Sequence, residues 1–293
     1  MSKNPYIKSC ISYSGGKYKL LPQILPRFPQ RKFRVFVEPF SGGCNIAQNI
    51  SADRYICCDT IKPLMDLFKY LHSGNIKTFV EDVDKVIAHF HLSKENQEGY
   101  LALRDLYNQH NPFGNDLEVD EEVLFFTLIC YCFNNQIRFN KNGEFNMPFG
   151  KNRSSFNEQL RKNLLAWVEK IQSIHISFTT KDYKDTFNSC IWYLTEQDFV
   201  YLDPPYLSSC ATYNENGGWT EEDEKTLYSY LVMLQDKNIP FALSNDASVN
   251  PNVVKWAEDR GLNVHHLNYS YSNCSYHKKD KDKKNDEILI TNY

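Results

Sequence analysis

The sequence lacks several features that would assign the chain to other classes of protein. It has no run of about 18 apolar residues, so we expect no membrane-spanning helix. The first residues, Met1 to Pro5, are polar and lack the apolar core of a signal peptide, which predicts a cytoplasmic protein. An excess of basic residues is also missing, since the formal net charge is −3. A nucleic-acid surface would therefore have to come from local clusters of Lys and Arg.

Paired cysteine motifs are absent as well. The nine cysteines are odd in number, scattered in spacing, and form no C-x-x-C pair. Several lie within apolar runs, so we interpret them as small buried hydrophobic residues in a reducing compartment. We expect neither a metal site nor disulfides from Cys10, Cys44, Cys57, Cys58, Cys130, Cys132, Cys190, Cys210 and Cys274.

The first part of the chain alternates between strand and helix patterns. Arg34–Phe40 is an apolar run typical of a buried strand, and Ser41–Gly43 forms the turn after it. A helix is expected to follow through Ala47 and Ile50. Arg54–Asp59 predicts a second strand, and Pro63 suits the first turn of a helix that runs through Leu71. This order predicts a doubly wound α/β sheet.

Residues 74–163 differ in character and predict a mainly helical insert. We expect helices at Tyr100–Leu106 and Glu121–Phe133, and then a loop rich in Asn, Gly and aromatic residues from Asn134 to Phe156. The α/β pattern resumes afterwards, with a helix that begins at Thr220 and has Asp223 at the capping-box position. Further strands are predicted at Asp198–Leu202, Pro240–Ser244, Val264–Tyr271 and Glu287–Thr291, and a mobile stretch at His277–Asn285.

The tetrapeptide Asp203-Pro204-Pro205-Tyr206 follows a predicted strand and carries the sharpest chemical signal. A plain turn is the alternative, because Pro and Asp both favour turns. An aromatic amine is a poor nucleophile, and a carboxylate and a backbone carbonyl that accept its two N–H bonds would localise its lone pair. Pro204 offers that carbonyl from a stiff backbone, and Tyr206 offers a flat face for an extruded base. The motif predicts methylation of a planar amine.

A glycine turn after the first predicted strand points to a bound nucleoside. Phe40-Ser41-Gly42-Gly43 follows a strand, and Asp59 ends the next strand, where an acid can bind ribose hydroxyls. A nicotinamide or flavin site would look similar, but the absence of G-x-G-x-x-G favours a mononucleoside over a dinucleotide. Tyr13-Ser14-Gly15-Gly16-Lys17 is a second glycine motif, which is too short for a P-loop and for which an ordinary turn is an equal alternative.

Together these motifs resemble the Dam family of DNA adenine-N6 methyltransferases, specifically its compact bacteriophage members. The similarity spans nearly the whole chain, and the motif order matches the family's α-type arrangement. It includes Tyr13–Lys17, Phe36–Gly43, Tyr55–Asp59, Phe133–Asn140, Gly143–Lys151 and Tyr201–Tyr206. The resemblance implies a class I S-adenosylmethionine methyltransferase (Rossmann-like) sheet formed by residues 1–73 and 164–293. It also implies that residues 74–163 are a target-recognition insert that binds DNA.

The resemblance also implies roles for individual residues. Asp203, Pro204, Pro205 and Tyr206 would hold the flipped adenine. The methyl donor, S-adenosylmethionine, would be enclosed by Tyr13, Gly15, Gly16 and Lys17, lined by Glu38, Phe40 and Gly42, held at its ribose by Asp59, and contacted at its adenine by Tyr183 and Asp185. No metal is implied.

In the insert, Phe133 matches an aromatic residue that wedges into the duplex near the extruded base. Arg138 matches the arginine that reads the guanine paired with the last cytosine of GATC, through its O6 and N7 acceptors. The neighbouring recognition positions are Asn134, Gln136 and Pro148.

Two positions depart from the family pattern. Ser12 stands where some cellular relatives carry a lysine that reads the first guanine, although phage members also lack that lysine. Gln136 stands where relatives carry Leu or Met against the thymine methyl group, and its polar amide would alter or relax preference at that base. GATC is therefore the expected target, with the first and thymine positions open.

Two other functions remain open at this level. A methylase-like DNA-binding protein without activity is disfavoured by the intact tetrapeptide. A methylase of cytosine N4 or of an RNA base is the other alternative; Asp203 favours adenine over cytosine N4, since cytosine N4 enzymes more often carry Ser there. The expected partner is double-stranded DNA in a bacterial or phage-infected cell, with the chain a monomer in solution and a dimer on DNA as the alternative.

Overall fold

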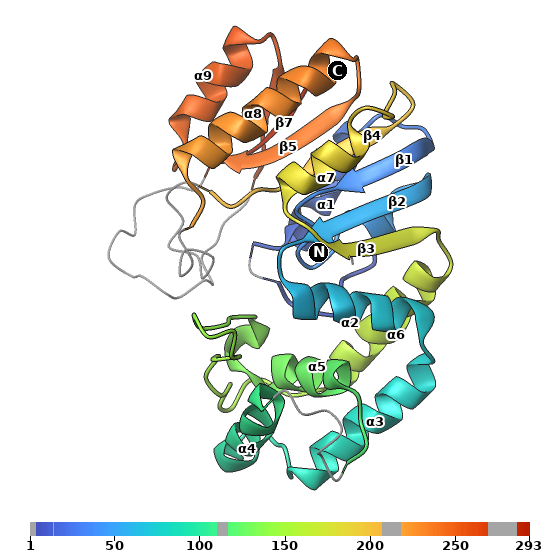
Figure 1. Ribbon diagram of the computed structural model, residues 1–293, viewed down its shortest axis with the longest axis vertical. Helices are drawn as coiled ribbons and strands as arrows, with labels where there is room; N and C mark the ends of the chain where they lie inside the picture. Colours follow the sequence, from blue (N-terminus) through green and yellow to red (C-terminus); the bar gives the residue numbers. More distant parts are fainter. Residues whose placement is uncertain (1–3, 14, 110–116, 207–217, 269–285) are drawn as a thin grey trace.

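The computed structural model describes residues 4–13, 15–109, 117–206, 218–268 and 286–293 (Figure 1). Seven strands among them form one sheet with the order β3-β2-β1-β4-β5-β7-β6. Strand β7 runs antiparallel to β5 and β6, whereas β1 pairs in parallel with β2 and β4. The strands are β1 Phe33–Glu38, β2 Ala52–Asp59, β3 Ile176–Thr180, β4 Phe199–Leu202, β5 Phe241–Asp246, β6 Asn263–His266 and β7 Glu287–Thr291.

Helices cover both faces of this sheet, so its central strands are buried on both sides. In β4, Phe199 and Tyr201 pack into one apolar cluster, while Val200 and Leu202 pack into the other. This double burial explains why the strand has a continuous apolar sequence instead of an alternating one. The second cluster contains apolar residues of α7 Tyr183–Cys190, α8 Glu221–Asp236 and α9 Pro251–Asp259. The first contains residues of α1 Leu21–Ile24, α2 Lys62–Ser73 and the insert.

The order of the strands reverses direction at β1. After β1 the chain builds β2 and β3 on one side, and then it returns to build β4 and β5 on the other. In open α/β sheets, ligands bind at such a switch point, beyond the carboxyl ends of the strands. The Phe40–Gly43 turn follows β1 and Asp203 follows β4, so the two main motifs meet at this place.

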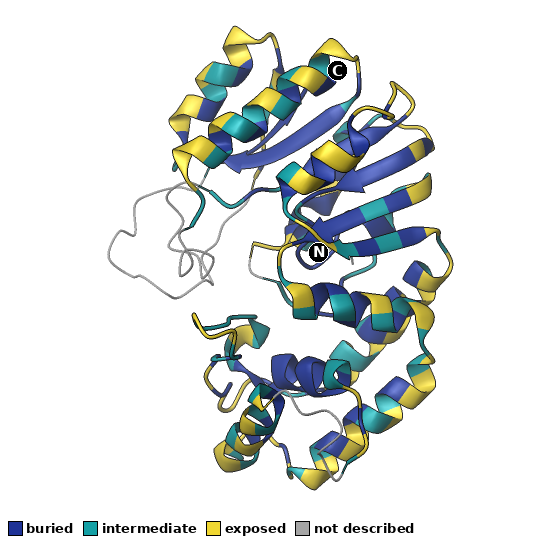
Figure 2. Ribbon diagram, viewed as in Figure 1, coloured by how far each residue is buried: buried dark blue, intermediate teal, exposed yellow. Residues whose placement is uncertain are grey.

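The segment between α2 and β3 is mainly helical. It contains α3 Ile76–His89, α4 Gln97–Asn108, α5 Glu121–Tyr131 and α6 Glu158–Gln172. Helix α5 is buried on all sides from Val123 to Tyr131, because it packs against α2, α3 and α4 (Figure 2). The boundary expected at residue 163 falls inside α6, so the helical part continues across it.

Several predicted elements are confirmed. Thr220 and Asp223 form the expected capping box of α8, Pro63 lies in the first turn of α2, and β7 spans Glu287–Thr291 as predicted. The predicted strand at Val264 ends at His266, and residues 269–285, including His277–Asn285, lie outside the described residues. No helix among the described residues has both the length and the apolar character needed to cross a membrane.

The prediction of a helix through Ala47 and Ile50 is wrong. Only a 3-10 turn forms, at Ala47–Asn49. The side-chain oxygens of Asn45 and Asn49 accept hydrogen bonds from the backbone of Ser9 and Ile7, at 3.2 and 2.8 Å. These contacts between distant parts of the chain override the local helical pattern.

The helix predicted to reach Phe133 is two residues too long. Helix α5 ends at Tyr131, and Asn134 and Asn135 both adopt positive φ angles. The Asn135 side-chain amide donates hydrogen bonds to the carbonyls of Ile129 and Cys130, at 3.0 Å each, which satisfies the end of the helix.

Candidate active site

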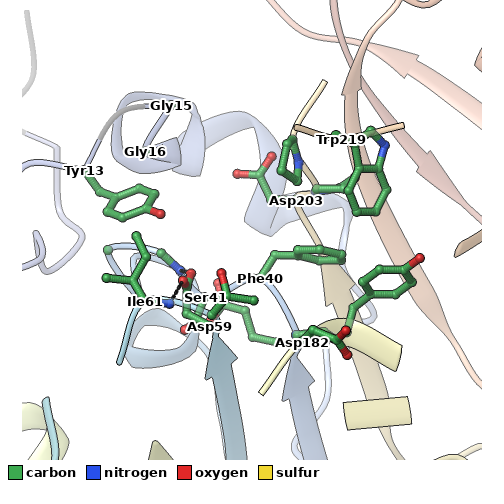
Figure 3. Close-up of a pocket in the computed structure, with 18 of the residues that line it drawn as sticks. Tyr13, Gly15, Gly16, Phe40, Ser41, Asp59, Ile61, Asp182, Asp203 and Trp219 are labelled. Carbon is green, nitrogen blue, oxygen red and sulfur yellow. Dashed lines mark hydrogen bonds between the residues drawn. The ribbon is translucent and has the colours of Figure 1, made fainter. Parts of the chain in front are cut away.

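A cavity of about 1040 Å³ lies beyond the carboxyl ends of the central strands (Figure 3). Turns after β1, β2 and β4 form its sheet wall, and Ile137, Arg138 and Phe139 of the insert also line it. Most residues that the sequence predicts for the site share this cavity. They are Tyr13, Gly15, Gly16, Lys17, Glu38, Phe40, Gly42, Asp59, Arg138, Tyr183, Asp203, Pro204, Pro205 and Tyr206.

The glycine turn after β1 is fixed by Asp59 at the end of β2. The Asp59 carboxylate accepts hydrogen bonds from the backbone N–H of Gly42 at 2.9 Å and of Ile61 at 3.0 Å. Gly42 has a φ of 45°, and a Cβ there would come within 2.8 Å of the Tyr13 ring. A side chain at Gly42 would therefore be strained and would displace the Tyr13 ring. Burial raises the pKa of Asp59, although its backbone N–H donors oppose the rise.

Lys17 reaches the tetrapeptide Asp203–Tyr206. Its ammonium nitrogen lies 2.8 Å from Asp203 Oδ1 and donates to the Tyr206 hydroxyl at 3.1 Å. The Tyr206 hydroxyl donates in turn to Glu287 Oε2 at 3.1 Å, and Glu287 is fully buried on β7. From the sequence, Lys17 was predicted to enclose the methyl donor, and Glu287 was not predicted as a site residue. The structure joins both to Tyr206, so the network fixes the side chains of the tetrapeptide.

The pKa of Asp203 reflects two opposing influences. Burial raises it, because the charged form loses its hydration, and the Lys17 ammonium lowers it. The net direction is upward. Tyr206 has a strongly raised pKa, owing first to burial and then to the carboxylates of Asp203 and Glu287, so it remains a neutral phenol. The tetrapeptide thus combines an acceptor carboxylate with an uncharged aromatic face.

An aromatic group lies at another part of the cavity. The ring of Phe40 stacks on Tyr183 at 5.3 Å and meets Trp219 edge-on at 5.7 Å. Trp219, just before the capping box of α8, was not predicted, since nothing in its local sequence marks it. Such a set of flat apolar faces suits a planar heterocycle.

At the start of α7, the acidic residue that lines the cavity is Asp182 and not the expected Asp185. Asp182 lines the cavity together with Tyr183, whereas Asp185 is exposed on α7 and is not part of the lining. The Asp182 side chain caps the helix by accepting the Asp185 backbone N–H at 2.8 Å. The rotation of the helix therefore directs Asp185 to solvent.

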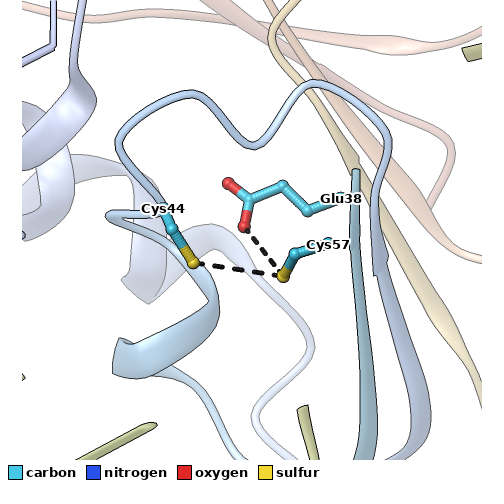
Figure 4. A group of neighbouring side chains, drawn as sticks. All are labelled: Glu38, Cys44 and Cys57. Carbon is cyan, nitrogen blue, oxygen red and sulfur yellow. Dashed lines mark hydrogen bonds between the residues drawn. The ribbon is translucent and has the colours of Figure 1, made fainter. Parts of the chain in front are cut away.

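Glu38, which lines the cavity, forms a buried group with Cys44 and Cys57, which are not part of the lining (Figure 4). The Cys44 thiol donates to Cys57 Sγ at 4.0 Å, and the Cys57 thiol donates to Glu38 Oε2 at 3.9 Å. Burial raises the pKa of Glu38 and of the Cys57 thiol well above their usual values. Such ligand atoms can hold a metal ion, but a chain of donating thiols fits the protonated, apolar role predicted for the cysteines.

The described cysteines are free and buried, in agreement with their predicted role. Cys210 and Cys274 lie outside the described residues.

The predicted DNA-binding residues gather on one loop of the insert. Phe133, Asn134, Gln136 and Arg138 lie on its first arm, and Pro148 lies on its second. The two arms are joined where the Phe133 backbone N–H donates to the Pro148 carbonyl at 2.8 Å. The Arg153 guanidinium lies 5.0 Å from the centre of the Phe133 ring and donates to Asn134 Oδ1 at 3.2 Å. Of the five predicted residues, only Arg138 lines the cavity.

The order of the described strands, the antiparallel direction of β7 and the cavity at the switch point define a class I S-adenosylmethionine-dependent methyltransferase fold.

Comparison with known families then identifies the group within this class. Residues 13–284 match the model of the D12 class N6 adenine-specific DNA methyltransferases, and the chain belongs to this family.

Curated relatives include longer and equally long proteins. The chain is 39% identical over its full length to the modification methylase StsI of Streptococcus sanguinis, and covers 44% of that protein. It is 37% identical over 99% of its length to the type II methyltransferase M.FokI of Planomicrobium okeanokoites, and covers 43% of it. The chain thus spans less than half of these two relatives. The DNA adenine methylase of Escherichia coli K12 is 28% identical over 99% of this chain and 95% of its own length.

Proposed function

We propose that this chain transfers a methyl group from S-adenosylmethionine to N6 of adenine in double-stranded DNA. The observation that carries the proposal is a shared cavity: Asp203 and Tyr206 line the same space as Asp59 and Phe40. An acceptor for a planar amine and a pocket for a nucleoside therefore lie within reach of each other. Holding two reactants in line provides much of the rate enhancement in such a transfer.

On the acceptor side, the target amine would donate its two N–H bonds to the Asp203 carboxylate and the Pro204 carbonyl. These bonds favour a pyramidal nitrogen with a localised lone pair. The ring of Tyr206 would stack on the flipped base, held in place through Lys17 and Glu287.

On the donor side, the residues present suit a cationic nucleoside. Asp59 and Glu38 are buried acids at the ends of adjacent strands, and Phe40 and Tyr183 offer stacked rings. Asp59 would bind the ribose hydroxyls and Tyr183 would contact the donor's adenine. The glycine turn with Tyr13, Gly15 and Gly16 would enclose the ligand. S-adenosylmethionine supplies the electrophilic methyl group when bound.

Residues 74–163 would bind the duplex, with GATC as the preferred target. Arg138 would read a guanine, while Phe133 would wedge into the helix beside the flipped adenine. Asn134, Gln136 and Pro148 would contact neighbouring bases. What supports this assignment is that the loop carrying them also contributes Arg138 to the cavity wall.

A modification role, protecting DNA against a cognate restriction enzyme, is favoured by the names of the two most similar relatives mentioned above.

The test is to incubate the protein with labelled S-adenosylmethionine and two duplexes of equal composition, one with GATC and one without it. We expect label in N6-methyladenine, identified by mass analysis after digestion, and faster transfer to the GATC duplex. Label in N4-methylcytosine would change the acceptor. No transfer by a folded, donor-binding protein would refute the proposed activity.

A further inference from the structure

The loop that carries Arg138 is a small antiparallel hairpin. Residues 132–150 contain two bridges, Cys132 to Phe149 and Phe139 to Phe145. Between them, the Asn146 backbone N–H donates to the Arg138 carbonyl at 3.1 Å. Arg138 and Asn146 therefore lie opposite each other on the two arms.

Asn146 also holds the Arg138 side chain. Arg138 Nε donates to Asn146 Oδ1 at 2.7 Å, and Arg138 Nη2 donates to the Asn146 carbonyl at 2.9 Å. A guanidinium has five N–H donors in one plane, arranged as two forked edges. Both bonds lie on the edge that contains Nε. The other edge, formed by Nη1 and the second N–H of Nη2, makes no hydrogen bond to any residue that the structure describes.

Helix α4 fixes the arm on which Asn146 lies. Asn108 exchanges two hydrogen bonds with the backbone of Phe145, at 2.8 and 3.1 Å. The Tyr100 hydroxyl donates to the Met147 carbonyl at 2.7 Å. Both neighbours of Asn146 are thus tied to the helix, and their side chains are buried. The support behind Arg138 is a rigid one.

We propose that Asn146 is a positioning residue that determines base specificity. By binding the Nε edge, it commits Arg138 to present its Nη1–Nη2 edge to two adjacent acceptors, the pattern that guanine offers in the major groove. A long arginine side chain would otherwise lose conformational freedom on each binding event. This inference rests on the proposed function, because it needs Arg138 to read a base.

The experiment uses the full chain and a library of duplexes in which the bases around one adenine are randomised. Methylated products are sequenced, so that the preference at every position is measured without assuming the target. Wild type is compared with Arg138→Ala, Asn146→Ala, Asn146→Asp and Asn142→Ala. Asn146→Asp keeps an acceptor for Nε, and Asn142, exposed in the same hairpin, is the matched control. Thermal unfolding and donor binding show that each variant is folded.

We expect Arg138→Ala to abolish a preference of about 5- to 150-fold at one position. Asn146→Ala should lower the preference at that same position, by up to about tenfold where the wild-type preference is at the top of this range, while Asn146→Asp and Asn142→Ala retain it. An equal loss of rate across all bases in Asn146→Ala would indicate a merely structural role and overturn the inference. Loss of preference in Arg138→Ala but not in Asn146→Ala would overturn it while leaving the proposed function intact. No methylation by wild type would overturn both.

Discussion

The two walls of the cavity hold their functional groups by different means. On the sheet wall, Asp59 is the last residue of β2 and Asp203 directly follows β4, so the parallel ladder sets their positions. On the insert wall, Arg138 lies in a hairpin, where it donates to the side-chain oxygen and the backbone carbonyl of Asn146, and Asn108 of α4 holds the neighbouring Phe145 backbone. The backbone thus sets where the groups that we assign to chemistry lie, although Lys17 and Glu287 also hold the tetrapeptide side chains. The group that we assign to base reading depends instead on its hydrogen bonds to Asn146.

This difference separates two kinds of mutational effect. A change on the sheet wall should alter rate or donor affinity equally for every DNA sequence. A change on the insert wall should alter which sequence is preferred. Substitutions on each wall test whether the walls are separable in this way.

The largest effect is expected for Asp203→Ala. Loss of the acceptor carboxylate should lower kcat by about 10²- to 10³-fold, as removal of one group that stabilises a transition state does elsewhere. Donor affinity should remain within about twofold, and base preference should not change. Single-turnover methylation and calorimetric titration with S-adenosylmethionine measure the two quantities.

Asp53→Ala is the matched control, because Asp53 is an exposed acid whose partner is Lys32 on the surface. Wild-type turnover in Asp203→Ala would show that the assigned role of this carboxylate is wrong.

Asp59→Ala should act mainly on the donor. Loss of the carboxylate removes the proposed ribose acceptor and the two backbone bonds that fix the Gly42 turn. Hydrogen bonds to charged groups are worth about 1.5–3 kcal/mol, so the Kd for S-adenosylmethionine should rise by about 10- to 100-fold. The relative rates on a set of DNA sequences should stay the same at saturating donor. A changed base preference would show that the two walls are coupled.

A smaller effect is expected in the pH dependence of Lys17→Met. Asp203 must be ionised to accept the amine, and its pKa is raised by burial, so kcat/KM falls as the pH drops through that raised value. The Lys17 ammonium opposes the rise. Its removal should raise the pKa further and move the acid limb upward by about one pH unit.

Lys17→Arg keeps the charge and should keep the midpoint of that limb within a few tenths of a unit. The midpoint, measured at constant ionic strength, is informative even if Lys17→Met lowers the rate at every pH. An unchanged midpoint would mean that Lys17 does not control the ionisation of Asp203.

Much of the sheet wall could be predicted from the sequence, because its signals are local. An apolar run that ends on an acid or a glycine turn predicted β1, β2 and β4 and the residues beyond them. The capping box at Thr220 was likewise readable from residues only three positions apart. The rotation of α7 about its axis could not be predicted in this way. Asp182 therefore lines the cavity at the motif where Asp185 was expected.

The unpredicted parts of the site depend on contacts between distant residues. Tyr206 and Glu287 are 81 positions apart, and Lys17 and Tyr206 are 189 apart. No local pattern marks such partners. Contacts between distant residues also explain why the helix predicted through Ala47 does not form. Asn45 and Asn49 instead bind residues near the N-terminus. On the insert wall, the residue types of the hairpin indicated a role, but the pairing of its two arms did not follow from them.

The smallest effect on activity is expected behind the sheet wall, at Cys57→Ala. Its thiol donates to Glu38 and receives from Cys44, and burial keeps it protonated. Loss of two weak buried hydrogen bonds and a small apolar group should lower the free energy of unfolding by about 1–2 kcal/mol. Turnover and donor affinity should stay within about twofold, and EDTA should leave the wild-type rate unchanged. Denaturant unfolding, methylation assays and metal analysis of the purified protein check these outcomes.

Stoichiometric zinc that is lost in Cys57→Ala, together with inactivation by the chelator, would instead make the Glu38, Cys44 and Cys57 group a structural metal site. The sheet wall would then depend on a bound ion as well as on its backbone.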